Sequence, residues 1–256
     1  YLATAPERVR ETFAQNGLTL VGGFLFEPFH DPAAHGPLTE KAHNLIDLVA
    51  ASGGKVLVLI DHISPPRERS AGRADAAPRL APDDFAAMTG LMADLTTRAA
   101  DKGVAAVIHH HAATYIEFDD EVDRVMEAVP QAGICVDTGH AAFSSVDPIA
   151  LVERYGSRVR HIHLKDIDST IRDKAVADAC GFDEAVSRGV FVPLGRGVVD
   201  FAAFAAAAEA AGYEGFATIE QDMDPTMSAP DVPLAAAKES LEFLVSAHPA
   251  YRVSAP

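Results

Sequence analysis

The chain has 256 residues, of which 48% are hydrophobic, and this is enough to bury one sizeable core. Its 37 acidic and 21 basic side chains give a formal charge of −16, which would repel the phosphate backbone of a nucleic acid. We therefore expect one domain, residues 1–256, and no nucleic acid as partner. Two cysteines cannot make a disulfide framework, which predicts the cytoplasm, and no apolar run approaches the ~20 residues of a membrane span, which predicts no membrane as partner.

Helical and extended patterns alternate along the chain. Apolar residues at helical spacing, often between an initial Pro or Asp and a final Gly, predict helices over residues 6–16, 38–51, 83–102, 119–129, 147–155, 200–211 and 233–246. Short apolar runs between them predict strands over residues 18–26, 55–60, 104–111, 133–137, 160–165 and 216–220. The irregular segment 62–82, rich in Arg, Pro and Gly, is interpreted either as a lid or as a disordered loop.

Such alternation requires a parallel sheet, either doubly wound or closed into a barrel. A nucleotide-binding sheet would carry a glycine-rich turn after its first strand, whereas Gly22 and Gly23 lie inside the predicted strand and no G-x-x-G follows. Acids and histidines end nearly every strand, which favours an α/β fold of the (β/α)8 TIM-barrel class with its site at the carboxyl ends. Since six strands are predicted and the chain opens on a helix, we expect the first two βα units to be absent and the chain to run from the third strand onward.

Four strand ends carry side chains suited to metal chemistry. Asp137 ends the strand in residues 133–137, Glu117 follows the triple histidine of the strand before it, and His163 and Glu220 end the last two strands. Three carboxylates and one imidazole form an oxygen-rich set suited to Mn²⁺, Mg²⁺ or Co²⁺, with Zn²⁺ or Fe²⁺ as alternatives. Lys165 continues the face of His163 and would lie above the metal, because side chains alternate along a strand.

Each of these residues also has a purely structural interpretation. Asp137 could cap the next helix, and His163 could be a hydrogen-bonded core residue. Glu117 could be a solvated loop acid, and Lys165 could pair with Asp137 or Asp166. The four metal ligands are therefore expected from their joint occurrence at equivalent strand ends rather than from any one position.

Further polar residues near the strand ends are candidates for the pocket. His109 and His111 should point into it, and Asp61 and His62 follow the second strand. The segment Gly195-Arg196-Gly197 predicts a turn before the helix at residue 200 rather than a phosphate cradle, although Arg196 could reach a substrate from it.

These motifs together resemble the sugar isomerase, epimerase and dehydratase barrels of the xylose-isomerase-like superfamily. The strings VDTGH at 136–140, HIHLKD at 161–166 and TIEQD at 218–222 are similar to its last three strand ends, and residues 191–201 to the connection between the last two. The triple histidine before a threonine and a glutamate resembles the inosose (2-keto-myo-inositol) dehydratase-like branch.

The resemblance implies one divalent metal ion held by Glu117, Asp137, His163 and Glu220. It implies a metal-binding lyase or isomerase of carbohydrate metabolism, placed in inositol catabolism, that removes a proton next to a ketone. The catalytic groups expected from it are Glu117, Glu220, Lys165 and His140. The expected contacts to substrate are His62, His109, His111, His140, Lys165 and Arg196.

The expected partner is an unphosphorylated cyclitol or sugar, and a homo-oligomer is compatible with the sequence. Three alternatives remain open beside an inosose dehydratase: a ketose 3-epimerase or sugar isomerase of the same superfamily, an endonuclease acting on abasic DNA, and a barrel that binds metal or sugar without turnover. The net acidity argues against the endonuclease, because such an enzyme needs a basic face.

Overall fold

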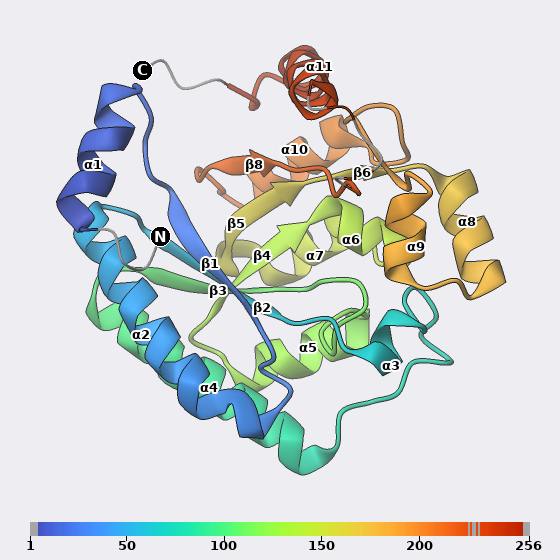
Figure 1. The fold of residues 1–256 in the computed structure, drawn as a ribbon. Helices are drawn as coiled ribbons and strands as arrows, with labels where there is room; N and C mark the ends of the chain where they lie inside the picture. The colour runs from blue at the N-terminus through green and yellow to red at the C-terminus, as the bar shows by residue number, and fades with distance from the viewer. Residues whose placement is uncertain (1–4, 225, 227–228, 230, 253–256) are drawn as a thin grey trace.

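The computed structural model describes residues 5–224, 226, 229 and 231–252. Its centre is a curved sheet of six parallel strands in the order β1-β2-β3-β4-β5-β8 (Figure 1). The strands are β1 (Gly22–Glu27), β2 (Val56–Asp61), β3 (Ala105–His109), β4 (Gly133–Asp137), β5 (Val159–Leu164) and β8 (Ala217–Ile219). This confirms the expected α/β fold of the TIM-barrel type. Within the described residues β1 and β8 do not pair with each other, so the sheet is an open half-barrel.

The longer helices, among them α2, α4 and α10, cover the outer face of this sheet. The helices of the described residues are α1 (Pro6–Gln15), α2 (His35–Ser52), α3 (Pro65–Glu68), α4 (Pro82–Asp101), α5 (Asp119–Ala128), α6 (Thr138–Phe143), α7 (Pro148–Tyr155), α8 (Ser169–Asp178), α9 (Phe182–Ser187), α10 (Phe201–Ala210) and α11 (Val232–Ala247). Figure 1 shows α2 and α4 beside the first strands, and α10 and α11 beside the last. None of the helices in the described part of the chain has the length and apolar composition needed to cross a membrane.

The helix α4 shows how the sequence determines these elements. Pro82 fits the first turn, where an amide hydrogen would have no partner, and Asp83 and Asp84 lie at the positive end of the helix dipole. One face of α4 buries Met88, Met92 and other apolar side chains against the sheet. Burying each such side chain stabilises the fold by roughly 1.5–3 kcal/mol.

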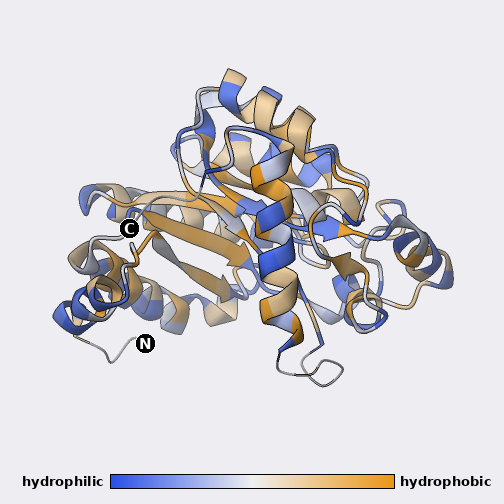
Figure 2. Ribbon diagram, turned by 90° about the horizontal axis from the view of Figure 1, so that it is seen from above, coloured by the Kyte–Doolittle hydropathy of each residue, from blue (hydrophilic) through white to orange (hydrophobic). Residues whose placement is uncertain are grey.

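Both faces of the central strand β4 are buried, and this decides where its last side chain points. Ile134 and Val136 pack with the outer helices, whereas Cys135 packs with Val58 and Val107 inside the half-barrel. Because side chains alternate, Asp137 lies on the same face as Cys135 and reaches the mouth of the sheet. Figure 2 shows the strands as largely hydrophobic ribbons between helices of mixed polarity.

Two segments differ from the sequence-based expectation. Segment 62–82 contains the short helix α3, and the side chain of Arg67 in this helix is completely buried, which anchors the segment. Beyond β5 the chain forms α8, α9 and a small antiparallel pair, β6 (Asp166–Ile167) with β7 (Phe191–Val192), none of which was predicted.

Candidate active site and metal centre

A pocket of about 440 Å³ runs along the inner face of the half-barrel and reaches the carboxyl ends of the strands, and its two walls differ in chemistry. The wall formed by β1 and β2 is apolar and includes Phe24, Phe26, Val58 and Ile60. The wall formed by β3, β5, β8 and the residues after them is polar and consists of His109, His111, His161, His163, Lys165, Thr218, Glu220 and Asp222. The pocket therefore presents its titratable groups from one side.

Asp137 performs two tasks with its two carboxylate oxygens. Oδ1 accepts hydrogen bonds from the amides of Gly139 and His140, both at 2.9 Å, and so caps α6. Oδ2 faces the site and lies 2.9 Å from Nζ of Lys165. Burial would raise the pKa of Asp137, but the Lys165 ammonium and hydrogen bonds from neighbouring histidines outweigh it and hold this pKa well below its usual range.

His163 and Glu220 meet Asp137 at this point. Nδ1 of His163 is 3.2 Å from Oε2 of Glu220 and 3.6 Å from Oδ2 of Asp137. One donor atom from each of these three residues lies within 4.8 Å of the other two. Carboxylate oxygens with an imidazole nitrogen at this spacing fit a divalent cation with bonds of about 2.0–2.2 Å. The structure therefore brings together three of the four metal ligands expected from the sequence.

Lys165 lies at the centre of an acidic cluster that consists of Asp137, Glu220 and Asp222. Its Nζ is 2.8 Å from Glu220 and 3.2 Å from Nε2 of His140, and it also lies 3.8 Å from Asp222. Burial alone would lower the pKa of Lys165, but the surrounding carboxylates raise it above its usual value. The side chain is therefore an ammonium that neutralises part of the cluster.

Asp222 was not singled out from the sequence as a site residue. It lines the pocket, and burial raises the pKa of its carboxyl group. The signal that could have identified it is its position two residues after Glu220, where alternation places both side chains on the same face.

The predicted substrate-binding histidines occupy different depths. His111 lines the pocket, and its ring centroid is 3.7 Å from that of His140. His140 is completely buried, contacts Nζ of Lys165 through Nε2 and is not part of the pocket wall. His62 is exposed and stacks on Phe26 at the mouth, outside the pocket lining.

Glu117 is not part of the cluster, which corrects the expected ligand set. Its Oε1 accepts hydrogen bonds from the amide of Gly72 at 2.7 Å and the hydroxyl of Ser144 at 3.0 Å. Its Oε2 accepts from the amide of Ala113 and from the guanidinium of Arg67. Four donors occupy the carboxylate, so Glu117 anchors segment 62–82 in this structure and does not reach the other three expected ligands.

Arg196 also lies away from the pocket. It is exposed and pairs with Glu239 on α11, which corrects its expected contact with substrate. The turn around it has a structural purpose, since the amides of Gly195, Gly197 and Val199 all donate to the carboxylate of Asp166. Asp61 is likewise structural, because it binds the backbone and ring of His30.

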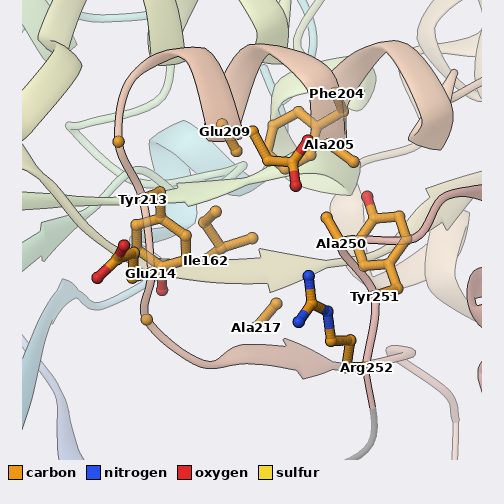
Figure 3. Close-up of a pocket in the computed structure, with 13 residues that line it drawn as sticks. Ile162, Phe204, Ala205, Glu209, Tyr213, Glu214, Ala217, Ala250, Tyr251 and Arg252 are labelled. Atoms are coloured by element: carbon orange, nitrogen blue, oxygen red, sulfur yellow. The ribbon is translucent and has the colours of Figure 1, made fainter.

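A second hollow of about 520 Å³ lies on the outer side of the sheet, between β5, β8 and α10 (Figure 3). Tyr213, Glu214, Tyr251 and Arg252 line it, and no residue of the acidic cluster reaches it. The acidic cluster therefore faces the pocket of about 440 Å³ and not this hollow.

Comparison with known proteins places this geometry in context. The sequence profile of the family described as "Xylose isomerase-like TIM barrel" matches residues 1–247. The rhizopine catabolism protein MocC of Rhizobium meliloti is 36% identical over 154 residues, which are 60% of this chain and 47% of MocC. An inosose dehydratase of Geobacillus thermodenitrificans is 33% identical over 193 residues, which are 74% of this chain and 64% of that enzyme. The chain thus spans about half to two thirds of the length of these relatives.

Solved structures agree in fold at low sequence identity. The IolI protein with a bound zinc atom superposes with a TM-score of 0.70 at 13% identity, over 96% of this chain and 83% of IolI. The 3-keto-D-glucoside 4-epimerase YcjR of E. coli has the same TM-score at 18% identity, over 96% of this chain and 86% of YcjR. At these identities the structures support the fold alone.

Proposed function

Because this chain belongs to the xylose isomerase-like TIM barrel family, we propose that it is a divalent-metal-dependent enzyme acting on a sugar or cyclitol ketone. Its proposed reaction is the removal of water from an inosose-like ketone. The observation that carries the proposal is the convergence of Asp137, His163 and Glu220 on one point, with Lys165 beside them in a pocket at the carboxyl ends of the strands.

Asp137, His163 and Glu220 would hold the metal ion. When bound, such an ion supplies a Lewis acid that polarises the ketone and makes the adjacent C–H bond acidic. The remaining chemistry falls to the side chains of the polar wall. His111, His161 and Thr218 line this wall and offer hydrogen-bonding groups for substrate hydroxyls.

Glu220 and Lys165 would move the protons. The carboxylate of Glu220, whose side chain is 34% exposed, takes the proton from the carbon next to the ketone. The Lys165 ammonium donates a proton to the hydroxyl on the next carbon, which leaves as water as the carbon–carbon double bond forms. Since Nζ of Lys165 is 2.8 Å from Glu220, the proton can return from Glu220 to Lys165 and restore both groups.

The relatives favour dehydration over epimerisation. An inosose dehydratase of Geobacillus thermodenitrificans is 33% identical over 193 residues, whereas the epimerase YcjR is similar in fold at 18% identity.

Proton exchange tests this proposal. The protein, loaded with Mn²⁺ or Co²⁺, is incubated in deuterated water with 2-keto-myo-inositol and a panel of ketoses, and the products are followed by NMR. We expect deuterium next to the carbonyl, followed by loss of the neighbouring hydroxyl. Exchange with inversion and no loss of water would replace dehydration by epimerisation. No exchange with any ketone would refute the enzymatic proposal.

A further inference from the structure

We propose that His109 is the fourth ligand of the metal ion, in place of Glu117, which the sequence analysis expected there. The site would then offer two imidazole nitrogens and two carboxylate oxygens, from His109, His163, Asp137 and Glu220. This inference rests on the proposed metal dependence and specifies which residues of this chain hold the ion.

Distances between the donor atoms carry the inference. Nε2 of His109 lies 3.1 Å from Nδ1 of His163 and 3.4 Å from Oδ2 of Asp137. For metal–ligand bonds of about 2.0–2.2 Å, neighbouring ligands are roughly 2.8–3.1 Å apart in an octahedral site and roughly 3.3–3.6 Å apart in a tetrahedral one. The two contacts of His109, and those of His163 to Glu220 at 3.2 Å and to Asp137 at 3.6 Å, all lie between the shortest octahedral and the longest tetrahedral separation.

The strand register explains why His109 reaches the site. His109 ends β3 and pairs with Cys135, two residues before Asp137 on the same face of β4. Its side chain therefore points into the half-barrel, directly beneath the carboxylate of Asp137. Nδ1 of His109 has no hydrogen-bond partner among the described residues, so the polar contacts of the ring are made through Nε2.

The local charges also agree with this ligand set. Asp137 and Glu220 balance the two positive charges of the ion, which leaves Lys165 to pair with Asp222 at 3.8 Å. Glu117 already has Arg67 as its partner and is not needed for neutrality.

Two imidazoles change the metal preference of the site. Imidazole nitrogen suits Zn²⁺, Co²⁺ and Fe²⁺, whereas an all-oxygen environment suits Mg²⁺. Cys135 lies close to both rings and belongs to a donor group with His109 and His163. We therefore expect Zn²⁺ or Co²⁺ to bind in preference to Mg²⁺.

The test counts nitrogen ligands and measures metal affinity separately from turnover. Cu²⁺ bound to the full chain is examined by pulsed electron paramagnetic resonance, and Zn²⁺ affinity is measured by chelator competition. We expect two imidazole ligands in the wild type and one in His109→Ala, with Zn²⁺ bound roughly 100-fold more weakly or worse. In His109→Glu, the affinity for Zn²⁺ should fall relative to the affinity for Mg²⁺. His62→Ala, an exposed imidazole outside the pocket, and Glu117→Gln should bind metal like the wild type.

The outcomes separate the two proposals. If the wild type binds metal through one imidazole, or if His109→Ala keeps its affinity while Glu117→Gln loses it, the assignment of His109 is overturned and the proposed enzyme survives. If the folded wild type binds no divalent metal, both proposals fail. Circular dichroism of each metal-free variant verifies that it is folded.

Discussion

At the scale of single residues, the two carboxylate oxygens of Asp137 have different partners. Oδ1 caps α6 by accepting from the amides of Gly139 and His140, whereas Oδ2 faces Nζ of Lys165 at 2.9 Å. Because a buried parallel strand delivers its last side chain to the mouth of the sheet, Oδ2 lies where the proposed metal ion would be held.

A substitution that keeps the cap and removes the charge tests this division. In Asp137→Asn the amide oxygen can still cap α6, but the buried ion pair with Lys165 is lost, so we expect a folded protein with a lowered melting temperature. Metal affinity should fall at least ~100-fold, because a carboxylate ligand is lost. Calorimetric titration with Zn²⁺ measures the effect. Asp147→Asn, which alters the cap of α7 in the same way, is the matched control and should bind metal normally.

Glu117 was misplaced from the sequence for a local reason. Ala113 adopts a left-handed backbone conformation with φ of 68°, and the chain turns there so that Glu117 points toward Arg67 and away from the pocket. Such a turn is rare for a residue other than glycine, and nothing in the alanine-rich sequence announces it. Distance along the chain from the histidines was therefore a poor guide to position.

The burial of Glu117 predicts a pH dependence of stability. Burial outweighs the Gly72 amide and Arg67 and raises the pKa of Glu117 from 4.5 to about 7. The folded protein holds the proton of the Glu117 carboxyl group more tightly than the unfolded chain does. The stabilising contribution of this group to the free energy of unfolding is therefore complete below about pH 4.5 and is lost as the pH rises through about 7. The difference corresponds to roughly 3 kcal/mol.

Urea unfolding of wild type and Glu117→Gln between pH 4.5 and 8, with chelator present, measures this contribution. We expect the wild type to lose free energy of unfolding relative to the variant as the pH rises. Parallel curves for the two proteins would contradict the raised pKa.

At the scale of elements, the sequence predicted the six parallel strands and most outer helices, because apolar runs and helical spacing are strong signals. The elements between β5 and α10 were missed. The strands β6 and β7 have two residues each and α9 has six, so their periodicity is too short to read. They form because Ile167, Phe182 and Phe191 bury together in a small apolar cluster, a tertiary cause without a local signature.

The contact between α6 and β5 predicts that Gly139 cannot be enlarged. A methyl group on Gly139 would collide with Cβ of Lys165 and crowd the ring of Phe191. We expect Gly139→Ala to cost about 1–3 kcal/mol of unfolding free energy and to displace Lys165, so that turnover falls sharply. Gly90→Ala in α4, where the added methyl group meets no atom within 4 Å, should instead be neutral or slightly stabilising. Thermal melts and proton-exchange rates are measured for both variants. If the two variants behaved alike, the predicted collision at Gly139 would be contradicted.

At the scale of the whole molecule, one cluster of side chains joins segments that are far apart in sequence. The proposed ligands come from β3, β4, β5 and the residue after β8, so a metal ion would connect four of the six strands of the sheet. Binding to the folded state alone stabilises it by about 2.7 kcal/mol at a hundredfold excess over the dissociation constant.

Chelation should therefore lower the melting temperature by several degrees, since 1 kcal/mol corresponds to roughly 2–4 °C in a chain of this size. Differential scanning calorimetry with Zn²⁺ and then with chelator measures the shift. The same treatment should move Asp137→Asn much less. An equal shift in both proteins would place the ion elsewhere.

The position of Lys165 has a consequence for how the site is assembled. Its ammonium bridges Asp137 and Glu220, so it relieves the mutual repulsion of these two carboxylates even when no metal ion is bound. The chain can complete its folding with this internal counter-ion in place and acquire the metal afterwards. Metal binding then replaces one cation by another in a cavity that is already folded, and it is reversible without unfolding. The metal-free protein should therefore be stable and competent to bind a metal ion.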